Sequence, residues 1–211
     1  MMGKRSKNED LLARVAQQLQ RGLIKRRAEI NACDGRFPKR QLFLALNGCK
    51  PLLSETFGSP VTSRWSVAKR KTPSDTLILE YLVDYGICRY SIPQAIRQPK
   101  RGPAELNSEQ KYEILLAAES ELGNDVEVAR DFLKLLDVKS QLKCLIFRKR
   151  PTHAKTKCLH DRLNWVLSHH KCFNSKDAIL LVGLPRAKTA RLDNDIDFRR
   201  VTDGKVARDC L

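Results

Sequence analysis

Three carboxylates stand out because they interrupt apolar segments. Asp84 lies within the run Leu79–Ile87, and Glu119 and Glu121 lie near the end of the run Leu116–Gly123. Burying an unpaired carboxylate is costly, and three converging carboxylates are costlier unless a cation lies among them. Oxygen ligands close to a phosphate are typical of Mg²⁺ sites. These residues therefore indicate a candidate metal site at Asp84, Glu119 and Glu121.

Whether these carboxylates meet depends on the conformation of one segment. By propensity Tyr112–Leu122 favours a helix, with Ser108 as its N-cap. As a strand it would present Glu119 and Glu121 on one face, because alternate side chains of a strand point the same way. In the helical alternative both would lie on an exposed helix face. A separate alternative makes Asp84 a strand-end residue paired with a nearby Arg or Lys. Propensity alone favours the helix.

The two acidic segments and the runs that follow them resemble the PD-(D/E)XK superfamily, which has the restriction-endonuclease-like fold. The following runs are Ala129–Leu136, which contains Asp-Phe-Leu-Lys-Leu-Leu, and Lys143–Phe147. The resemblance covers roughly Leu77–Phe147 and implies a core of a helix, three strands, a helix and a further strand. It implies that Asp84 is the metal-binding Asp of the second strand and that Glu119-Ser120-Glu121 is the D/E-x-K motif of the third. It therefore favours a strand at residues 112–122.

The resemblance also implies an activity, the metal-dependent hydrolysis of phosphodiester bonds in DNA, in restriction, phage defence or a mobile element. Asp84, Glu119 and Glu121 would hold Mg²⁺, with Mn²⁺ as a substitute. The lysine of the motif is replaced by Glu121, and Lys134 is the catalytic candidate to supply the missing charge. Lys134 follows Asp131 at i+3, so a surface salt bridge explains this pair equally well. The alternatives left open are Lys139 or Lys143 for this lysine, and Glu29 or Glu55 for a further glutamate from the first core helix.

The charge of the chain favours a polyanionic partner. The chain has 40 Lys and Arg against 24 Asp and Glu, a formal net charge of +16, and phosphate attraction needs only basic residues spread over one face. We expect the partner to be nucleic acid, with double-stranded DNA favoured and a homodimer suited to cutting both strands. A non-catalytic nucleic-acid-binding protein, or a subunit of a nucleoprotein complex on a degenerate nuclease fold, is the alternative. Nine basic residues are candidates for binding the nucleic acid: Lys69, Arg70, Lys71, Arg97, Lys100, Arg101, Arg148, Lys149 and Arg150.

The order of elements predicts an α/β domain with a central mixed sheet of about four to six strands flanked by helices. Helical spacing predicts helices at Asp10–Ile30, Gln41–Asn47, Asp125–Leu136 and Thr156–His170. Apolar and β-branched content predicts strands at Thr62–Lys69, Thr76–Tyr90, Lys143–Phe147, Ala178–Val182 and Ile196–Val201. Residues 1–50 would form a basic helical region packed on a nuclease core of residues 51–211, as one domain overall.

Several other classes are disfavoured. No apolar run approaches the roughly 18 residues of a transmembrane helix, and the first residues run into charges instead of an apolar signal segment. The seven cysteines are widely spaced, which argues against a disulfide framework, and we expect a cytoplasmic protein. Trp65 and Trp165 are expected in the core and not as base-stacking platforms. A zinc site has suitable residue types but unsuitable spacing at Cys158, His160, His169, His170 and Cys172.

Overall fold

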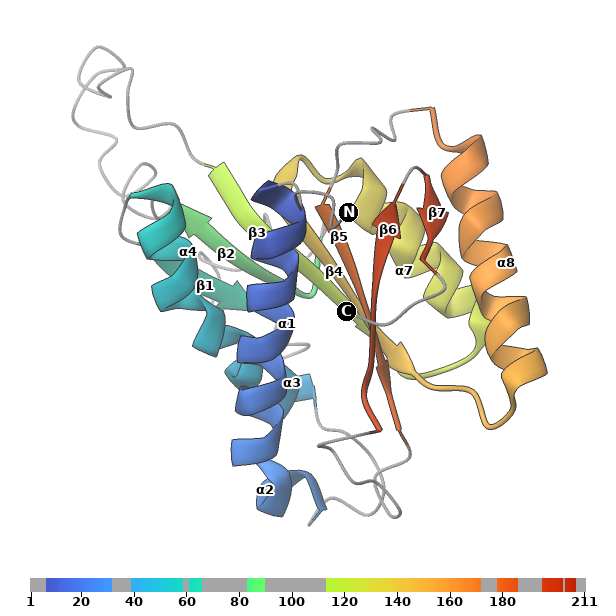
Figure 1. The fold of residues 1–211 in the computed structure, drawn as a ribbon, viewed down its shortest axis with the longest axis horizontal. Coiled ribbons are helices and arrows are strands. Elements are labelled where there is room, and N and C mark those ends of the chain that lie inside the picture. Colours follow the sequence, from blue (N-terminus) through green and yellow to red (C-terminus); the bar gives the residue numbers. More distant parts are fainter. Residues whose placement is uncertain are drawn as a thin grey trace, which may run out of the picture.

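The computed structural model describes residues 7–31, 39–58, 61–65, 83–89, 113–171, 178–185, 195–202 and 204–207. Its helices are α1 (Lys7–Lys25), α2 (Arg27–Asn31), α3 (Lys39–Leu46), the 3-10 helix η1 (Asn47–Cys49), α4 (Lys50–Phe57), α7 (Asp125–Asp137) and α8 (His153–His169). Its strands are β1 (Val61–Trp65), β2 (Tyr85–Arg89), β3 (Glu113–Glu121), β4 (Ser140–Arg148), β5 (Ala178–Leu184), β6 (Asp197–Thr202) and β7 (Lys205–Val206). Figure 1 shows these elements as a twisted sheet with helices packed against it.

The strands lie in sequence order across an open mixed sheet. β1, β2 and β3 are antiparallel neighbours, β4 and β5 then run parallel to β3, and β6 is antiparallel to β5. The short β7 pairs with β6. The protein is therefore an α/β protein with a six-stranded mixed sheet packed with helices. Because β3, β4 and β5 are parallel, their carboxyl ends meet at one edge of the sheet, which is where ligands commonly bind in open α/β sheets.

Helices cover both faces of the sheet, and each face has its own apolar core. On one face α1, α3 and α4 pack against the strands, and on the other face α7 and α8 do so. The helical spacing of α1 explains why it packs against the sheet. It has an apolar face whose residues point the same way and are at most 3% exposed: Leu12, Val15, Leu19 and Leu23. None of the described helices has the length and apolarity needed to cross a bilayer.

The segment at residues 112–122 forms β3, as the family resemblance implies and against its helical propensity. β3 lies between β2 and β4, and its seven inner residues are buried. A strand covered on both faces needs a continuous apolar run and not an alternating one, and Ile114–Ala118 supplies that run. Tertiary burial therefore outweighs the preference of Leu, Ala and Glu for helix.

Other elements differ from the sequence-based expectation. The helix expected at Asp10–Ile30 is broken at Arg26, whose N–H donates to the carbonyl of Leu23 at 3.1 Å. The helix α4 was not expected; it ends at Gly58, whose φ of +65° is the left-handed conformation that glycine adopts without strain. Asp84 lies in a bend immediately before β2 and not inside a strand. Most of the strand expected at Thr76–Tyr90, and Ser66–Lys69 of the strand before it, lie outside the described residues.

Candidate active site

Asp84 and Glu119 come together where β2 begins and β3 ends. Tyr85 pairs with Ala118 in the antiparallel register of these strands, so Asp84 lies beside the next residue of β3, Glu119. The Oδ2 atom of Asp84 accepts hydrogen bonds from the backbone N–H of Ser120 at 3.0 Å and from the Ser120 hydroxyl at 3.1 Å. These two bonds hold the Asp84 carboxylate against the end of β3.

Glu119 is a carboxyl group enclosed by the protein. The residue is 2% exposed, because it lies on the face of β3 that α7 covers. Burial first, and then the charge of Asp84, raise the pKa of Glu119 from its ordinary value of 4.5 to about 8, while Lys134 acts in the opposite direction. Glu119 and Asp84 are therefore close enough to repel each other, and a cation near both would relieve that repulsion.

Among the described residues, Lys134 of α7 is one of two lysines that contact these carboxylates. Its Nζ atom lies 3.4 Å from Oε1 of Glu119 and 2.7 Å from Oδ1 of Asp131. The salt bridge between Asp131 and Lys134, an i, i+3 pair on one helix, is thus present. The same ammonium group also contacts the buried Glu119. Hydrogen bonds and charge from the two carboxylates raise the pKa of Lys134 against an opposing effect of burial, so the ammonium stays charged at neutral pH.

Lys39 of α3 is the second lysine, and the sequence patterns did not indicate it. Its Nζ atom lies 2.9 Å from Oδ2 of Asp84. The packing of α3 explains this contact, since Phe43 stacks on Tyr85 with ring centroids 5.3 Å apart, and the Tyr85 hydroxyl donates to Asn47 at 2.9 Å. The contact joins residues 45 positions apart in the chain, a separation over which periodicity carries no signal.

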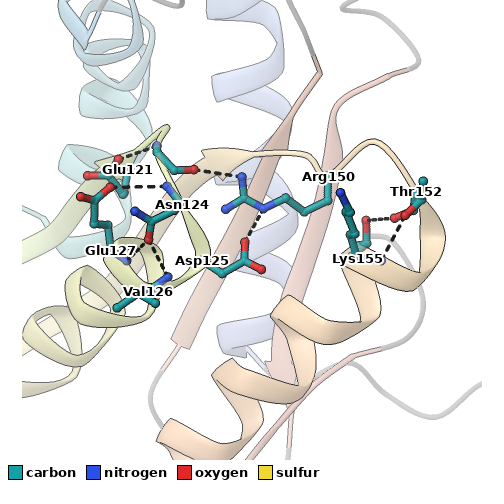
Figure 2. A network of polar contacts seen from close by, with 10 residues as sticks. Glu121, Asn124, Asp125, Val126, Glu127, Arg150, Thr152 and Lys155 are labelled. Carbon is teal, nitrogen blue, oxygen red and sulfur yellow. Dashed lines mark hydrogen bonds and ion pairs between the residues drawn. The ribbon is translucent and has the colours of Figure 1, made fainter.

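Glu121 takes part in a different set of contacts. Its Oε1 atom accepts the backbone N–H of Gly123 at 2.5 Å, and Figure 2 shows this carboxylate turned toward the start of α7. Glu119 and Glu121 do share a face of β3, but only Glu119 contacts Lys134. Within the part of the chain that the structure describes, no three His, Cys, Asp or Glu side chains form a group that could hold a metal ion.

The turn that follows Glu121 is fixed by the cap of α7. The side chain of Asn124 accepts the N–H groups of Val126 at 2.9 Å and Glu127 at 3.0 Å, and Glu127 reaches back to the N–H of Asn124. Arg150 donates to the carbonyl of Gly123 at 3.0 Å and pairs with Asp125 at 2.5 Å. Figure 2 shows these contacts joining the loop after β3 to the loop after β4.

The other candidates for the missing lysine and glutamate lie elsewhere. Lys143 is 4% exposed and donates to the carbonyl of Leu136 at 3.2 Å, and Lys139 precedes β4 at the opposite edge of the sheet. Glu55 pairs with Arg14 at 3.5 Å on the surface, and Glu29 is exposed on α2. Lys134 is therefore the one expected lysine that reaches Glu119 among these candidates.

The donor chemistry at Asp84 and Glu119 fits a hard divalent cation. Mg²⁺ commonly binds proteins through one or two carboxylates and completes its shell with waters and substrate phosphates. Asp84 and Glu119 supply two carboxylates beside each other. Burial is the main cause of the raised pKa of Glu119 and the charge of Asp84 is the second, and a cation would offset the second of these. When bound there, Mg²⁺ would supply an activated water and Lewis-acid stabilisation of negative charge.

The predicted nucleic-acid contacts are described only in part. Arg148 ends β4 and lies opposite Leu184 of β5, and Lys149 is exposed beside it. Arg150 is mostly enclosed by its contacts with Gly123 and Asp125, with 12% of its side chain exposed. Both remaining basic segments lie outside the described residues: Lys69, Arg70, Lys71, Arg97, Lys100 and Arg101.

The structure also bears on the expectations for the tryptophans and for the zinc candidates. Trp165 is 61% exposed, so its expected place in the core is wrong; the side chain of Trp65 is not described. Of the zinc candidates, Cys158 is exposed on α8 and His170 pairs with Asp137 at 2.9 Å, while Cys172 lies outside the described residues.

Comparison of the chain with protein-family models, curated proteins and solved structures found no match.

Proposed function

We propose that this protein is a metal-dependent nuclease that hydrolyses phosphodiester bonds, with DNA as its substrate, on a restriction-endonuclease-like fold. The observation that carries the proposal is the buried Glu119 beside Asp84, with Lys134 at 3.4 Å from Glu119. A carboxylate pair with a nearby lysine is the minimum set that binds a divalent cation and still offers positive charge to a phosphate.

The topology supports the same proposal. The helices α1, α2, α3, η1 and α4 come first, and β1, β2, β3, α7 and β4 then follow in order. The family resemblance implies a helix, three strands, a helix and a strand, which this order contains with additional helices before β1. The two acidic residues lie close to the positions that the resemblance implies: Asp84 is in the bend immediately before β2, and Glu119 is in β3, two residues before its end. The departure from the family pattern at Glu121 is offset by Lys134, which reaches the site from the following helix.

Each side chain would have a distinct task in this reaction. Asp84 and Glu119 would hold the cation, and the bonds from Ser120 would orient the Asp84 carboxylate. Lys134 would present its charge to the scissile phosphate as negative charge develops there. Glu121 would orient the turn before α7 through Gly123 instead of acting as a ligand.

A non-catalytic nucleic-acid-binding protein is the second candidate, and one observation favours it. Lys39 and Lys134 each pair with one of the two carboxylates, so their charges are already balanced within the protein. A degenerate site held by two such pairs would keep the fold and lose turnover. Cleavage assays separate the two functions.

The test is cleavage of supercoiled plasmid by the wild type, Asp84→Asn and Glu119→Gln in Mg²⁺, in Mn²⁺ and in EDTA. We expect nicking or linearisation that needs metal and is lost in both variants, while DNA retention in a gel shift stays equal or increases because a repulsive charge is removed. Lys134→Met should slow cleavage by about 10²–10³-fold, the usual effect of removing one electrostatic contact to the transition state.

Lys139→Met is the matched control for the lysine, because Lys139 lies at the other edge of the sheet. It should cleave at the wild-type rate. Metal-dependent cleavage that persists in Asp84→Asn would refute the assignment of the site. DNA binding by the wild type without any cleavage would establish the non-catalytic alternative.

A further inference from the structure

The outer surface of α7 and α8 carries most of the exposed large apolar side chains of the described residues. Val126, Leu133 and Trp165 lie on these helices, and the fourth, Ile24, lies on α1. Trp165 is the most exposed, at 61%, and the imidazole of His169 covers one face of its indole with ring centroids 4.4 Å apart and an angle of 23° between the planes. An ordered, exposed aromatic ring of this kind is available for stacking.

Trp165 belongs to a single stripe along α8. Lys155, Cys158, Arg162, Trp165 and His169 follow one another at intervals of three and four residues, which puts them on one side of a helix. All five are exposed. Two cations therefore precede an exposed indole on the same side of the helix. A polymer that carries negative charges and flat aromatic rings would be complementary to this stripe of side chains.

The stripe begins in a groove at the carboxyl edge of the sheet. The groove has a volume of about 680 Å³, and its lining includes Arg130, Arg150 and Lys155 together with Asp125 and Glu127. Asp125 is already paired with Arg150, and Glu127 completes the cap of α7. Arg130 and Lys155 are exposed at its walls, so the groove presents cations toward the solvent.

The groove also adjoins the proposed catalytic edge. Arg150 donates to the carbonyl of Gly123, two residues after Glu121 of β3, and Figure 2 shows Arg150 between the end of β3 and the start of α8. A nucleic-acid strand that extends from the carboxyl edge of β3 would contact the groove first and α8 next. The two surfaces are continuous but do not share a residue with the carboxylate pair.

We propose that the groove and the α8 stripe bind an unpaired nucleic-acid strand, with phosphates against Lys155 and Arg162 and a base stacked on Trp165. The proposal rests on nucleic acid being the partner in the proposed function, and it adds a strand-binding surface outside the catalytic site. The occupant is unpaired because a ring stacks on a base only where the base face is free. The ten helical steps from Lys155 to Trp165 span about 15 Å, which is enough to contact several nucleotides.

The test measures binding separately from cleavage. Fluorescein-labelled single-stranded DNA and the matching duplex are titrated in EDTA, and anisotropy is recorded for the wild type, Trp165→Ala and Trp165→Phe. We expect Trp165→Ala to weaken single-strand binding by about five- to one-hundred-fold, with less than threefold change for the duplex, and Trp165→Phe to restore most of the loss. Ile24→Ala is the matched control, because Ile24 is an exposed apolar residue on the opposite face of the sheet, and it should bind as the wild type does.

Three results would overturn the inference. One is single-strand binding by Trp165→Ala at the wild-type affinity. Another is an equal loss for single strand and duplex. The third is a change from dimer to monomer in Trp165→Ala without a change in binding, which would make the surface a protein interface. Plasmid cleavage in Mg²⁺ with no Trp165-dependent strand binding would refute this inference and leave the proposed function standing, whereas Trp165-dependent binding without cleavage would do the reverse.

Discussion

At the scale of single residues, Glu119 is the side chain on which most of the proposed chemistry depends. It is 2% exposed, lies beside Asp84, and has a pKa raised to about 8. Burial of an acid beside a second acid lowers stability unless the charge is removed by a proton or balanced by a cation. The same side chain thus links folding to protonation and, in the proposed function, to metal binding, and each can be measured.

The raised pKa of Glu119 predicts how stability depends on pH. Because the folded-state pKa lies above the unfolded value, the stabilisation is fully present below about pH 4.5 and is lost as the pH rises through about 8. In EDTA we expect the free energy of unfolding of the wild type to fall by a few kcal/mol across this window, at about 1.4 kcal/mol per pKa unit. Urea unfolding at intervals between these pH values measures the change.

Glu119→Gln provides the control for this measurement, because the neutral amide does not titrate. Its unfolding free energy should change less with pH than that of the wild type. Added Mg²⁺ should stabilise the wild type at pH 8 and leave Glu119→Gln unchanged. Parallel pH profiles for the two proteins would show that Glu119 titrates with an ordinary pKa.

At the scale of elements, the placement of α3 decides whether Lys39 can reach Asp84. α3 packs against α1 at Gly22, where a Cβ atom would lie 2.9 Å from both the Cα and the carbonyl oxygen of Ala45. Those are backbone atoms, so they cannot move aside as the end of a flexible side chain would. The close approach of the two helices therefore requires glycine at this position.

Gly22→Ala should therefore destabilise the protein. Overpacking of this kind typically costs about 1–3 kcal/mol, which exceeds the gain of up to about 1 kcal/mol expected for Ala in a helix. Urea or thermal unfolding monitored by circular dichroism measures the net effect. Gly48→Ala is the matched control, since the nearest atom to its added Cβ would be 3.9 Å away. Equal or greater stability of Gly22→Ala would contradict the packing described here.

At the scale of the whole molecule, the protein has a net charge of +16, and the carboxyl edge of its sheet carries both acidic and basic residues. Asp84 lies before β2 and Glu119 lies near the end of β3, while Arg148 ends β4 and Lys149 follows it. In the proposed function such a distribution would attract a polyanion over a wide area, and the carboxylate pair would take the cation. Arg150 belongs to the structure of this edge, because it joins the two loops.

The charge distribution predicts that nucleic-acid binding depends steeply on salt. Lys149→Gln should reduce the slope of log K against log salt by about one, because one phosphate contact is removed. Duplex binding measured between roughly 50 and 200 mM NaCl gives the slope. Lys139→Gln, at the opposite edge of the sheet, should leave it unchanged. An equal slope for Lys149→Gln and the wild type would exclude Lys149 from the interface.

The features that depend on local pattern could be predicted from the sequence. The amphipathic spacing of α1 and α8 and the apolar runs of β4 and β5 follow from short-range periodicity and side-chain type. The candidate carboxylates Asp84 and Glu119 could also be found, because an acid within an apolar run is costly to bury without a partner.

The features that depend on long-range contact could not be predicted from the sequence. β3 is a strand because β2 and β4 enclose it on either side, although its residues favour a helix. Lys39 reaches Asp84 through the packing of α3, and the carboxylate of Glu121 accepts the N–H of Gly123 in the turn before α7. Trp165 is exposed because Leu163, Val166 and Leu167 already supply the buried face of α8. Pairing across a sheet and packing between helices join distant residues, and a local pattern holds no information about them.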